Sequence, residues 1–283
     1  MPSLKHTRKR IVSVRNTQQI TKAMKMVSAA KLRRAQEAAE NARPYARRLE
    51  ELLANVSATV GDATHPFLEP GSDAPAEVIV ITSDRGLCGG YNANLIKKAE
   101  AFLRSEEGRE ATIVTCGRRG DDYFRKHAGP SLRDRYVNRA FDIELAREVA
   151  RNAAGRFLSG SVGAVYVVYS QFRSAIAQSP ALVRLLPVET ATRSATDVEY
   201  LYEPEPAGLL QLLVARYIET KVYQAMLEAT ASEHGARMTA MDSAARNASD
   251  MIDRLTLQMN RARQATITTE LMEIVGGAEA LKG

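Results

Sequence analysis

Two segments of the chain space small and apolar residues in alternating steps of three and four. Toward the C-terminus this repeat consists of Met238, Met241, Ala245, Ala248, Ile252, Leu255, Met259, Ala262 and Thr266. Such steps place side chains along one stripe of a helix and are typical of a coiled coil, although the core of an ordinary helical bundle produces the same stripe. Near the N-terminus Ile20, Met24 and Val27 have the same spacing. We therefore predict that the two terminal helices pair with each other.

The positions of proline and glycine divide the chain into three parts. Residues 3–43 contain neither, residues 207–283 contain no proline, and eight of the ten prolines fall between residues 66 and 206. A helix of about 70 residues would be roughly 100 Å long, whereas a compact chain of this length has a radius of gyration of about 19 Å. A helix over 208–274 must therefore project and needs a partner. The predicted division is a shaft helix in 1–60, a central domain in 61–206 and a second shaft helix in 207–283.

The central part alternates short apolar runs with helical patterns. Strands are predicted at 78–82, 111–115, 163–169 and 182–188, and helices at 92–107, 121–127 and 141–157. This alternation favours a small, mostly parallel, doubly wound sheet. The predicted fold class is therefore α/β with a long helical coiled coil.

Charge is distributed unevenly along the chain. The net charge is +6, yet residues 1–36 contain ten basic and no acidic residues. A basic segment of this kind is typical of proteins that bind nucleic acid, an anionic membrane surface or an acidic protein surface, and it is also typical of a transit peptide. Residues 1–44 contain no Phe, Trp or Tyr for base stacking, which weakens the alternative of a basic-armed nucleic-acid-binding protein. No apolar run approaches the ~20 residues of a membrane span.

Catalytic and cofactor motifs are missing. The segment 82–92 follows a predicted strand and contains Gly86, Gly89 and Gly90, but this spacing matches neither a dinucleotide fingerprint nor a phosphate-binding loop. We interpret it as a tight turn with positive φ. The four histidines are dispersed, and Cys88 and Cys116 are interpreted as small buried side chains. We expect no catalytic residue, no cofactor and no metal, which argues against a nucleotide-dependent enzyme and for an interaction protein.

Three stretches carry a family resemblance that extends over essentially the whole chain. They are 11–36 (IVSVRNTQQITKAMKMVSAAKLRRAQ), 82–92 (TSDRGLCGGYN), and 231–242 (ASEHGARMTAMD) taken with 260–278 (NRARQATITTELMEIVGGA). Together they resemble the gamma subunit of F-type ATP synthases, the central rotor shaft. The resemblance implies an antiparallel coiled coil inside a hexamer of alpha and beta subunits. It also implies that the α/β domain lies beside the epsilon subunit and on a membrane ring of c subunits.

The resemblance also assigns individual residues. It places Tyr200 and Glu203 against the membrane ring, and it places Met24, Arg263, Gln264, Thr268 and Glu270 in rotor–stator contacts with beta subunits. It implies a non-catalytic subunit that transmits rotation for ATP synthesis and regulates ATPase activity and proton flow. Residues 189–206 contain no cysteine, so the thiol switch of chloroplast relatives is not expected. Because the family pattern starts within the first few residues, we expect a bacterial protein, peripheral at the cytoplasmic face of the plasma membrane.

Overall fold

The computed structural model describes residues 4–60, 65–189 and 205–280. The chain forms two compact units, one made of residues 1–27 with 238–283 and the other of residues 28–237. Two long helices, α1 (Leu4–Val60) and α5 (Pro206–Ala280), each contribute one part to both units. The predicted pair of long terminal helices is confirmed, whereas the three-part division of the sequence at residues 60 and 206 stays a prediction.

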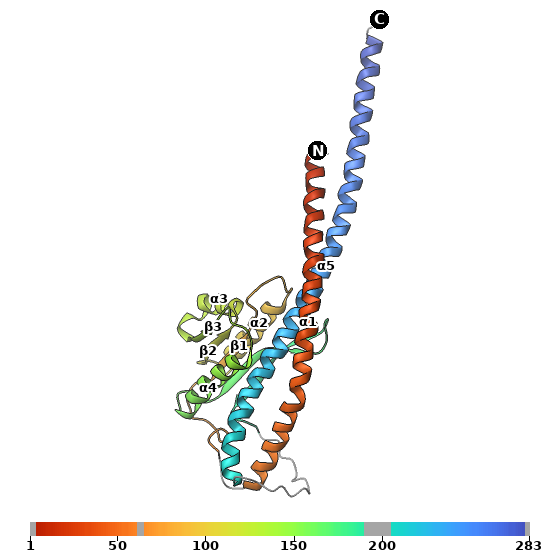
Figure 1. Ribbon diagram of the computed structural model, residues 1–283. Coiled ribbons are helices and arrows are strands. Elements are labelled where there is room, and N and C mark those ends of the chain that lie inside the picture. The colour runs from red at the N-terminus through yellow and green to blue at the C-terminus, as the bar shows by residue number, and fades with distance from the viewer. Residues whose placement is uncertain (1–3, 61–64, 190–204, 281–283) are drawn as a thin grey trace. The chain divides into compact units, whose positions relative to one another are not determined.

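The first unit is a pair of helices that run in opposite directions, as Figure 1 shows for the red and blue segments. Lys25 Nζ on α1 lies 2.6 Å from Asp242 Oδ1 on α5. On α5 the predicted stripe is buried or half-buried from Met238 to Ala262, and Met241, Ala245, Ala248 and Leu255 are its most buried members. The antiparallel coiled coil is therefore confirmed. The seam on α5 combines small residues, such as Ala245 and Ala248, with larger ones, such as Met241 and Leu255.

The predicted seam on α1 is correct at Met24 and wrong at Ile20 and Val27. Ile20 and Val27 are 60% and 57% exposed, and the buried or half-buried positions are Leu4, Thr7, Ile11, Val14, Gln18, Thr21 and Met24. The actual seam thus contains polar residues. Apolar spacing points to Ile20 and Val27, which lie beside the seam and face outward.

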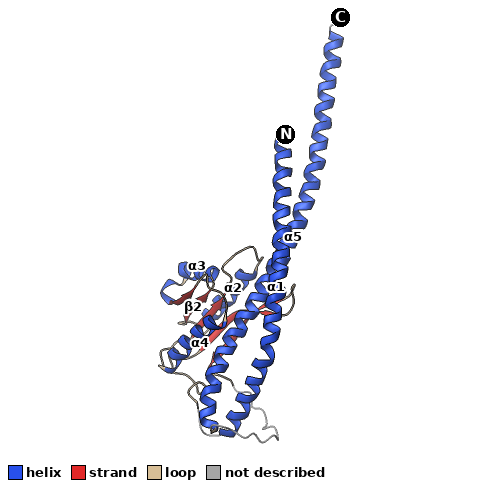
Figure 2. Cartoon of the chain, in the orientation of Figure 1, coloured by secondary structure: helices blue, strands red, loops and turns tan. Residues whose placement is uncertain are grey.

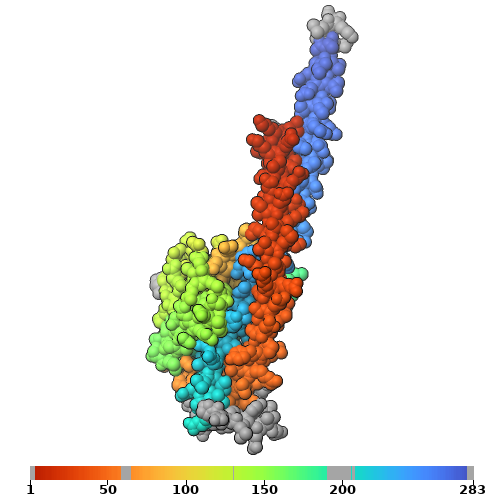
Figure 3. Space-filling model, viewed as in Figure 1, coloured from red at the N-terminus to blue at the C-terminus, as the bar shows by residue number. Residues whose placement is uncertain are grey.

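Thr266, the last member of the predicted α5 seam, is exposed. The described part of α1 begins at Leu4, and Figure 3 shows that α5 extends beyond this point with no other part of the chain on its visible face. The stripe therefore loses its partner before residue 266.

The second unit is built on a five-stranded sheet. Its strands are β1 (Glu77–Ile81), β2 (Thr112–Cys116), β3 (Leu132–Tyr136), β4 (Val165–Phe172) and β5 (Gln178–Leu186). Their order is β3-β2-β1-β4-β5, and every pairing is parallel except that of β4 with β5. Between them lie α2 (Tyr91–Leu103), α3 (Arg118–His127), the short η1 (Gly129–Ser131) and α4 (Ile143–Leu158). The mostly parallel sheet is confirmed, and β3 is an additional strand that the sequence did not predict.

The two faces of the sheet bury different helices, and the strands lie between them in Figure 2. Val78 and Val80 of β1 point toward α2 and α3. Ile79 and Ile81 point toward α4, the end of α1 and the first part of α5. Because successive strand residues face opposite sides, a strand covered on both sides reads as a continuous apolar run. This explains why β1 was recognisable from its sequence.

Candidate functional site

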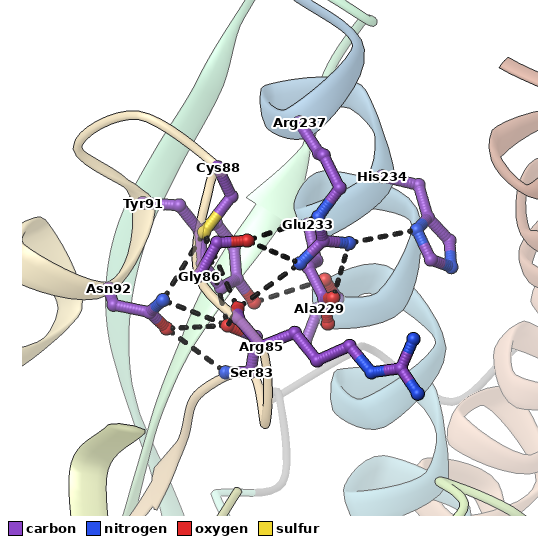
Figure 4. A network of polar contacts seen from close by, with 10 residues as sticks. All are labelled: Ser83, Arg85, Gly86, Cys88, Tyr91, Asn92, Ala229, Glu233, His234 and Arg237. Atoms are coloured by element: carbon purple, nitrogen blue, oxygen red, sulfur yellow. Dashed lines mark hydrogen bonds and ion pairs between the residues drawn. The ribbon is translucent and has the colours of Figure 1, made fainter. Parts of the chain in front are cut away.

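In a doubly wound sheet, ligands bind at the carboxyl ends of the strands where the strand order reverses. Here that point lies between β1 and β4, and the turn that follows β1 stands beside it. Ser83 N donates to Asn92 Oδ1 at 3.0 Å, and Asn92 Nδ2 donates to Cys88 Sγ at 3.2 Å, so the turn is closed by its own side chains (Figure 4). The expected positive φ occurs at Gly89, at 58°, and also at Leu87, at 62°.

Residues of α5 cover this turn. Arg237, which is 9% exposed, donates from Nη2 to the backbone oxygens of Arg85 and Gly86, each at 3.2 Å. Tyr91 Oη donates to the carbonyl oxygen of Ala229 at 3.0 Å, as Figure 4 shows. The place where a nucleotide would lie in a related sheet is therefore filled by a helix and a guanidinium of the same chain.

The ionisable side chains of this network, Glu233, His234 and Arg237, interact with one another. Glu233 Oε1 lies 2.6 Å from Arg237 Nη1, and burial raises the pKa of Glu233. Burial, with Arg237 and Lys31 nearby, lowers the pKa of His234 to about 4. His234 is therefore neutral at pH 7. Its Nδ1 can then accept from the Arg237 guanidinium, 3.4 Å away, without repulsion between two cations.

A second potential anion site, the N-terminus of α3, is also occupied from within. Asp84 Oδ1 accepts hydrogen bonds from the backbone N of Arg118 at 2.9 Å and of Asn138 at 3.0 Å. Gly117 precedes the helix with φ of 99°, and a Cβ there would lie 2.1 Å from the carbonyl oxygen of Thr82. The backbone thus approaches β1 closely, as in a phosphate-binding fold, but a carboxylate takes the place of the phosphate.

We expect the isolated chain to bind neither ATP nor NAD, because Asp84 and Arg237 occupy the two positions that a nucleotide would need. Isothermal titration calorimetry at pH 7 should give no binding heat above the heat of dilution for either nucleotide. A saturable heat with a micromolar dissociation constant would contradict this interpretation of the turn.

The predicted rotor–stator residues all lie in the helix-pair unit. Met24 is half-buried on α1, next to the Lys25–Asp242 ion pair. The remaining four, on α5, are exposed: Arg263, Gln264, Thr268 and Glu270. The predicted ring contacts, Tyr200 and Glu203, lie outside the described residues.

Three threonines near the end of α5 bond to their own helix. The hydroxyls of Thr266, Thr268 and Thr269 each donate to the backbone oxygen four residues earlier, at 3.0, 2.9 and 3.0 Å. Such back-bonding is a common way to satisfy a hydroxyl on a helix.

Exposed apolar side chains on this unit were missed as functional candidates. On α1 these are Val12, Ile20, Met26 and Val27, and beyond the paired region of α5 they are Ile267, Leu271, Met272, Ile274 and Val275. A helix that exposes so many apolar side chains requires a partner surface. The signal was present in the sequence as apolar residues beside the heptad stripe.

Within the described residues, no helix combines the length and apolar character needed to cross a membrane. In the same ranges, no three His, Cys, Asp or Glu side chains gather in a way that could hold a metal ion. Cys88 and Cys116 are buried, and burial raises the pKa of Cys116 to about 12. Both thiols fit the small buried side chains expected from the sequence.

Comparisons with known proteins agree with each other. A family model described as ATP synthase matches residues 3–281. The ATP synthase gamma chains of Pelotomaculum thermopropionicum and Moorella thermoacetica are each 49% identical to this chain, over 286 and 284 residues that span all of both proteins.

Solved structures are similar as well. A chain in the central stalk/c-ring structure of Tetrahymena thermophila mitochondrial ATP synthase matches 80% of this chain and 99% of its own length, with 26% identity and a TM-score of 0.60. A chain of the Euglena gracilis mitochondrial ATP synthase matches 98% of this chain and 94% of its own length, with a TM-score of 0.69. At 20% identity, the Euglena match shows a shared fold.

Proposed function

The chain belongs to the ATP synthase gamma chain family and is therefore a non-catalytic, central-stalk subunit of that complex, and we propose that its helix pair turns as a slim shaft inside a hexamer of alpha and beta subunits. Rotation would pass between this hexamer and a proton-driven membrane ring of c subunits. In the same proposal the α/β unit lies beside the epsilon subunit, and the chain is peripheral at the cytoplasmic face of a bacterial plasma membrane.

One observation carries the proposal. The seam of the helix pair includes small residues such as Ala245 and Ala248, and apolar residues such as Ile20, Val27 and Ile274 point outward. A helix pair that exposes apolar side chains among its charged ones fits a narrow bore that surrounds it on all sides. The exposed side of α1 also carries basic side chains, among them Lys9, Arg15 and Lys22, but the family and its relatives give the nucleic-acid-binding alternative no support.

We propose Met24, Arg263, Gln264, Thr268 and Glu270 as rotor–stator contacts. Arg263 and Gln264 are exposed neighbours, so both can reach a surrounding surface. A guanidinium forms bidentate contacts with a carboxylate, and Gln adds a neutral donor. These contacts would form with one beta subunit and break before the next.

We expect Arg263→Ala with Gln264→Ala to leave the chain folded and assembled but to slow ATP hydrolysis and synthesis about tenfold, the effect of losing ~1.4 kcal/mol from a rate-limiting step. The matched control is Arg254→Ala with Gln258→Ala, because these residues are also exposed on α5 but lie on another side of the helix. Steady-state turnover of purified complexes measures the effect. Wild-type turnover in an assembled double variant would show that Arg263 and Gln264 make no functional rotor–stator contact.

We also propose that Tyr200 and Glu203 contact polar loops of the membrane ring. Glu203→Lys would then place like charges together if Glu203 meets a basic ring residue. We expect ATP-driven proton pumping to fall more than ATPase activity, because an exposed ion pair contributes only ~0–1 kcal/mol to assembly but orients the contact. Pumping that stays coupled to hydrolysis as in the wild type would reject the assignment.

A further inference from the structure

A cluster of three arginines lies around one carboxylate at the contact between α4 and α5. Arg216 Nη1 lies 3.0 Å from Glu219 Oε2, Arg147 Nε lies 3.6 Å from the same oxygen, and Arg151 Nε lies 3.4 Å from Glu219 Oε1. The Glu219 side chain is 12% exposed. One negative charge therefore faces three positive charges, and the cluster has a surplus of two.

The three arginines have N–H donors that Glu219 does not engage. Arg147 Nε is buried and has no hydrogen-bond partner, since its distance to Glu219 is too long for one. The side chains of Arg151 and Arg216 are 72% and 56% exposed, so their remaining N–H groups point into a region that a second molecule can reach. A guanidinium carries five donors, and a single carboxylate satisfies only a few of the fifteen present here.

Apolar side chains flank the cluster on both helices. Leu212, one turn before Arg216 on α5, is 63% exposed, and Ile143, one turn before Arg147 on α4, is 36% exposed. An arginine centre with aliphatic neighbours is the composition of a protein interface, where arginine is enriched. A free phosphate needs only the charges and makes no use of Leu212 or Ile143.

We propose that Arg147, Arg151 and Arg216 form a docking surface for an acidic segment of another subunit of the complex, with Leu212 and Ile143 as its apolar flanks. A second carboxylate binds the two exposed guanidinium groups and brings the cluster closer to neutrality. Glu219 holds the three arginines in place and remains inside the contact. This inference rests on the proposed function, because the partner is a fellow subunit.

The test uses the whole complex purified from membranes, with a photo-crosslinking amino acid in place of Leu212. Mass spectrometry of the adduct should identify one peptide of another subunit that contains Asp or Glu. In that background, Arg151→Glu with Arg216→Glu should lower the yield of the adduct about tenfold or more. Arg104→Glu with Arg125→Glu makes the same change of charge at arginines that are 79% and 54% exposed and each paired with a carboxylate, and it should leave the yield within about twofold.

The outcomes separate the two proposals. A chain that never co-purifies with ATP synthase subunits overturns the proposed function and the docking surface together. A chain that assembles but gives no adduct, or adducts with lipid alone, overturns only the docking surface. Equal loss of adduct in both charge-reversed variants also overturns it, because the effect would then come from net charge. Inorganic phosphate that abolishes the adduct at millimolar concentration, with no acidic peptide found, identifies a free anion as the occupant and rejects the protein partner.

Discussion

Met24→Lys should lower the number of protons pumped per ATP hydrolysed by the assembled complex, whereas Met24→Leu should leave this ratio unchanged. Met24 is half-buried on α1, and its neighbour Lys25 is paired with Asp242 at 2.6 Å. A lysine at position 24 can keep its aliphatic stem along the seam and extend its ammonium group outward. The helix pair therefore stays folded, and in the proposed function the new charge faces the stator.

The size of the effect follows from the strength of the new contact. If the ammonium pairs with an acidic stator group at one angle of rotation, each ~1.4 kcal/mol of that contact slows departure about tenfold. The delay lowers the turnover rate, and the ratio of protons to ATP falls when hydrolysis proceeds without the delayed rotation. Leucine keeps the volume of methionine and adds no charge, so it is the matched control. Proton pumping and ATP hydrolysis are measured on the same vesicles. An unchanged ratio with Lys at position 24, and a change in thermal stability alone, would reduce Met24 to a packing residue.

Arg156→Met should lower the free energy of unfolding by about 3–5 kcal/mol, the usual cost of leaving a buried charge without its partner. Glu77, the first residue of β1, is fully buried, and Arg156 Nη2 on α4 donates to its Oε1 at 2.8 Å. Arg156 Nη1 donates to Asp134 Oδ2 on β3, also at 2.8 Å. One guanidinium thus connects α4 to two strands that do not pair with each other.

This loss of stability should depend on pH. Burial already raises the pKa of Glu77 above its ordinary value of 4.5, against the lowering effect of Arg156. Without Arg156 the folded-state pKa rises further, so the neutral acid is the form that the folded state favours. The stability of the variant is therefore retained at pH near 4.5 and falls as pH rises through the folded-state pKa of Glu77. The difference from the wild type should be larger at pH 8 than at pH 5.

Thermal unfolding of the isolated chain at several pH values measures both effects. Arg104→Ala is the control, because its pair with Glu100 is exposed on the arginine side and should contribute ~0–1 kcal/mol. Adding Glu77→Gln to Arg156→Met should recover part of the loss and remove most of its pH dependence. A loss for Arg156→Met that is as small as the control's, or that does not vary with pH, would show that the pair contributes little.

Much of the fold could be predicted because its long helices and its most apolar strands can be recognised from the local sequence alone. β1 and β4 are continuous apolar runs, and the long helices contain few breakers. β3, with the sequence LRDRY, has charged residues at three of five positions and is held by contacts from elsewhere, such as Arg135 with Asp121 and Asp134 with Arg156. A strand of this kind has no apolar signal, so local reasoning could not find it.

The seam of α1 shows a second limit. Hydrophobic spacing selected Ile20 and Val27, yet Thr21 and Ser28 are the buried positions. In this protein an apolar residue on a helix need not point to the partner helix, because the outward face also carries apolar side chains among its basic ones. The prediction failed because it assumed that the outer face meets water.

The closed network around the turn after β1 could not be predicted for a different reason. Arg237 lies about 150 positions from the carbonyl groups that it binds, and no local pattern links the two. The sequence indicated only that the turn lacked a nucleotide motif. The structure adds that Asp84 and Arg237 fill the space, which is a physical reason for the missing motif.

The threonines near the end of α5 bear on how smoothly the shaft can turn. Each of the hydroxyl protons of Thr266, Thr268 and Thr269 is engaged by the helix's own backbone. A surrounding wall therefore finds no free hydroxyl proton at these positions, and each oxygen can only accept. Friction in a molecular bearing comes from bonds that favour one angle over the next, and Thr266, Thr268 and Thr269 offer no donor for such a bond.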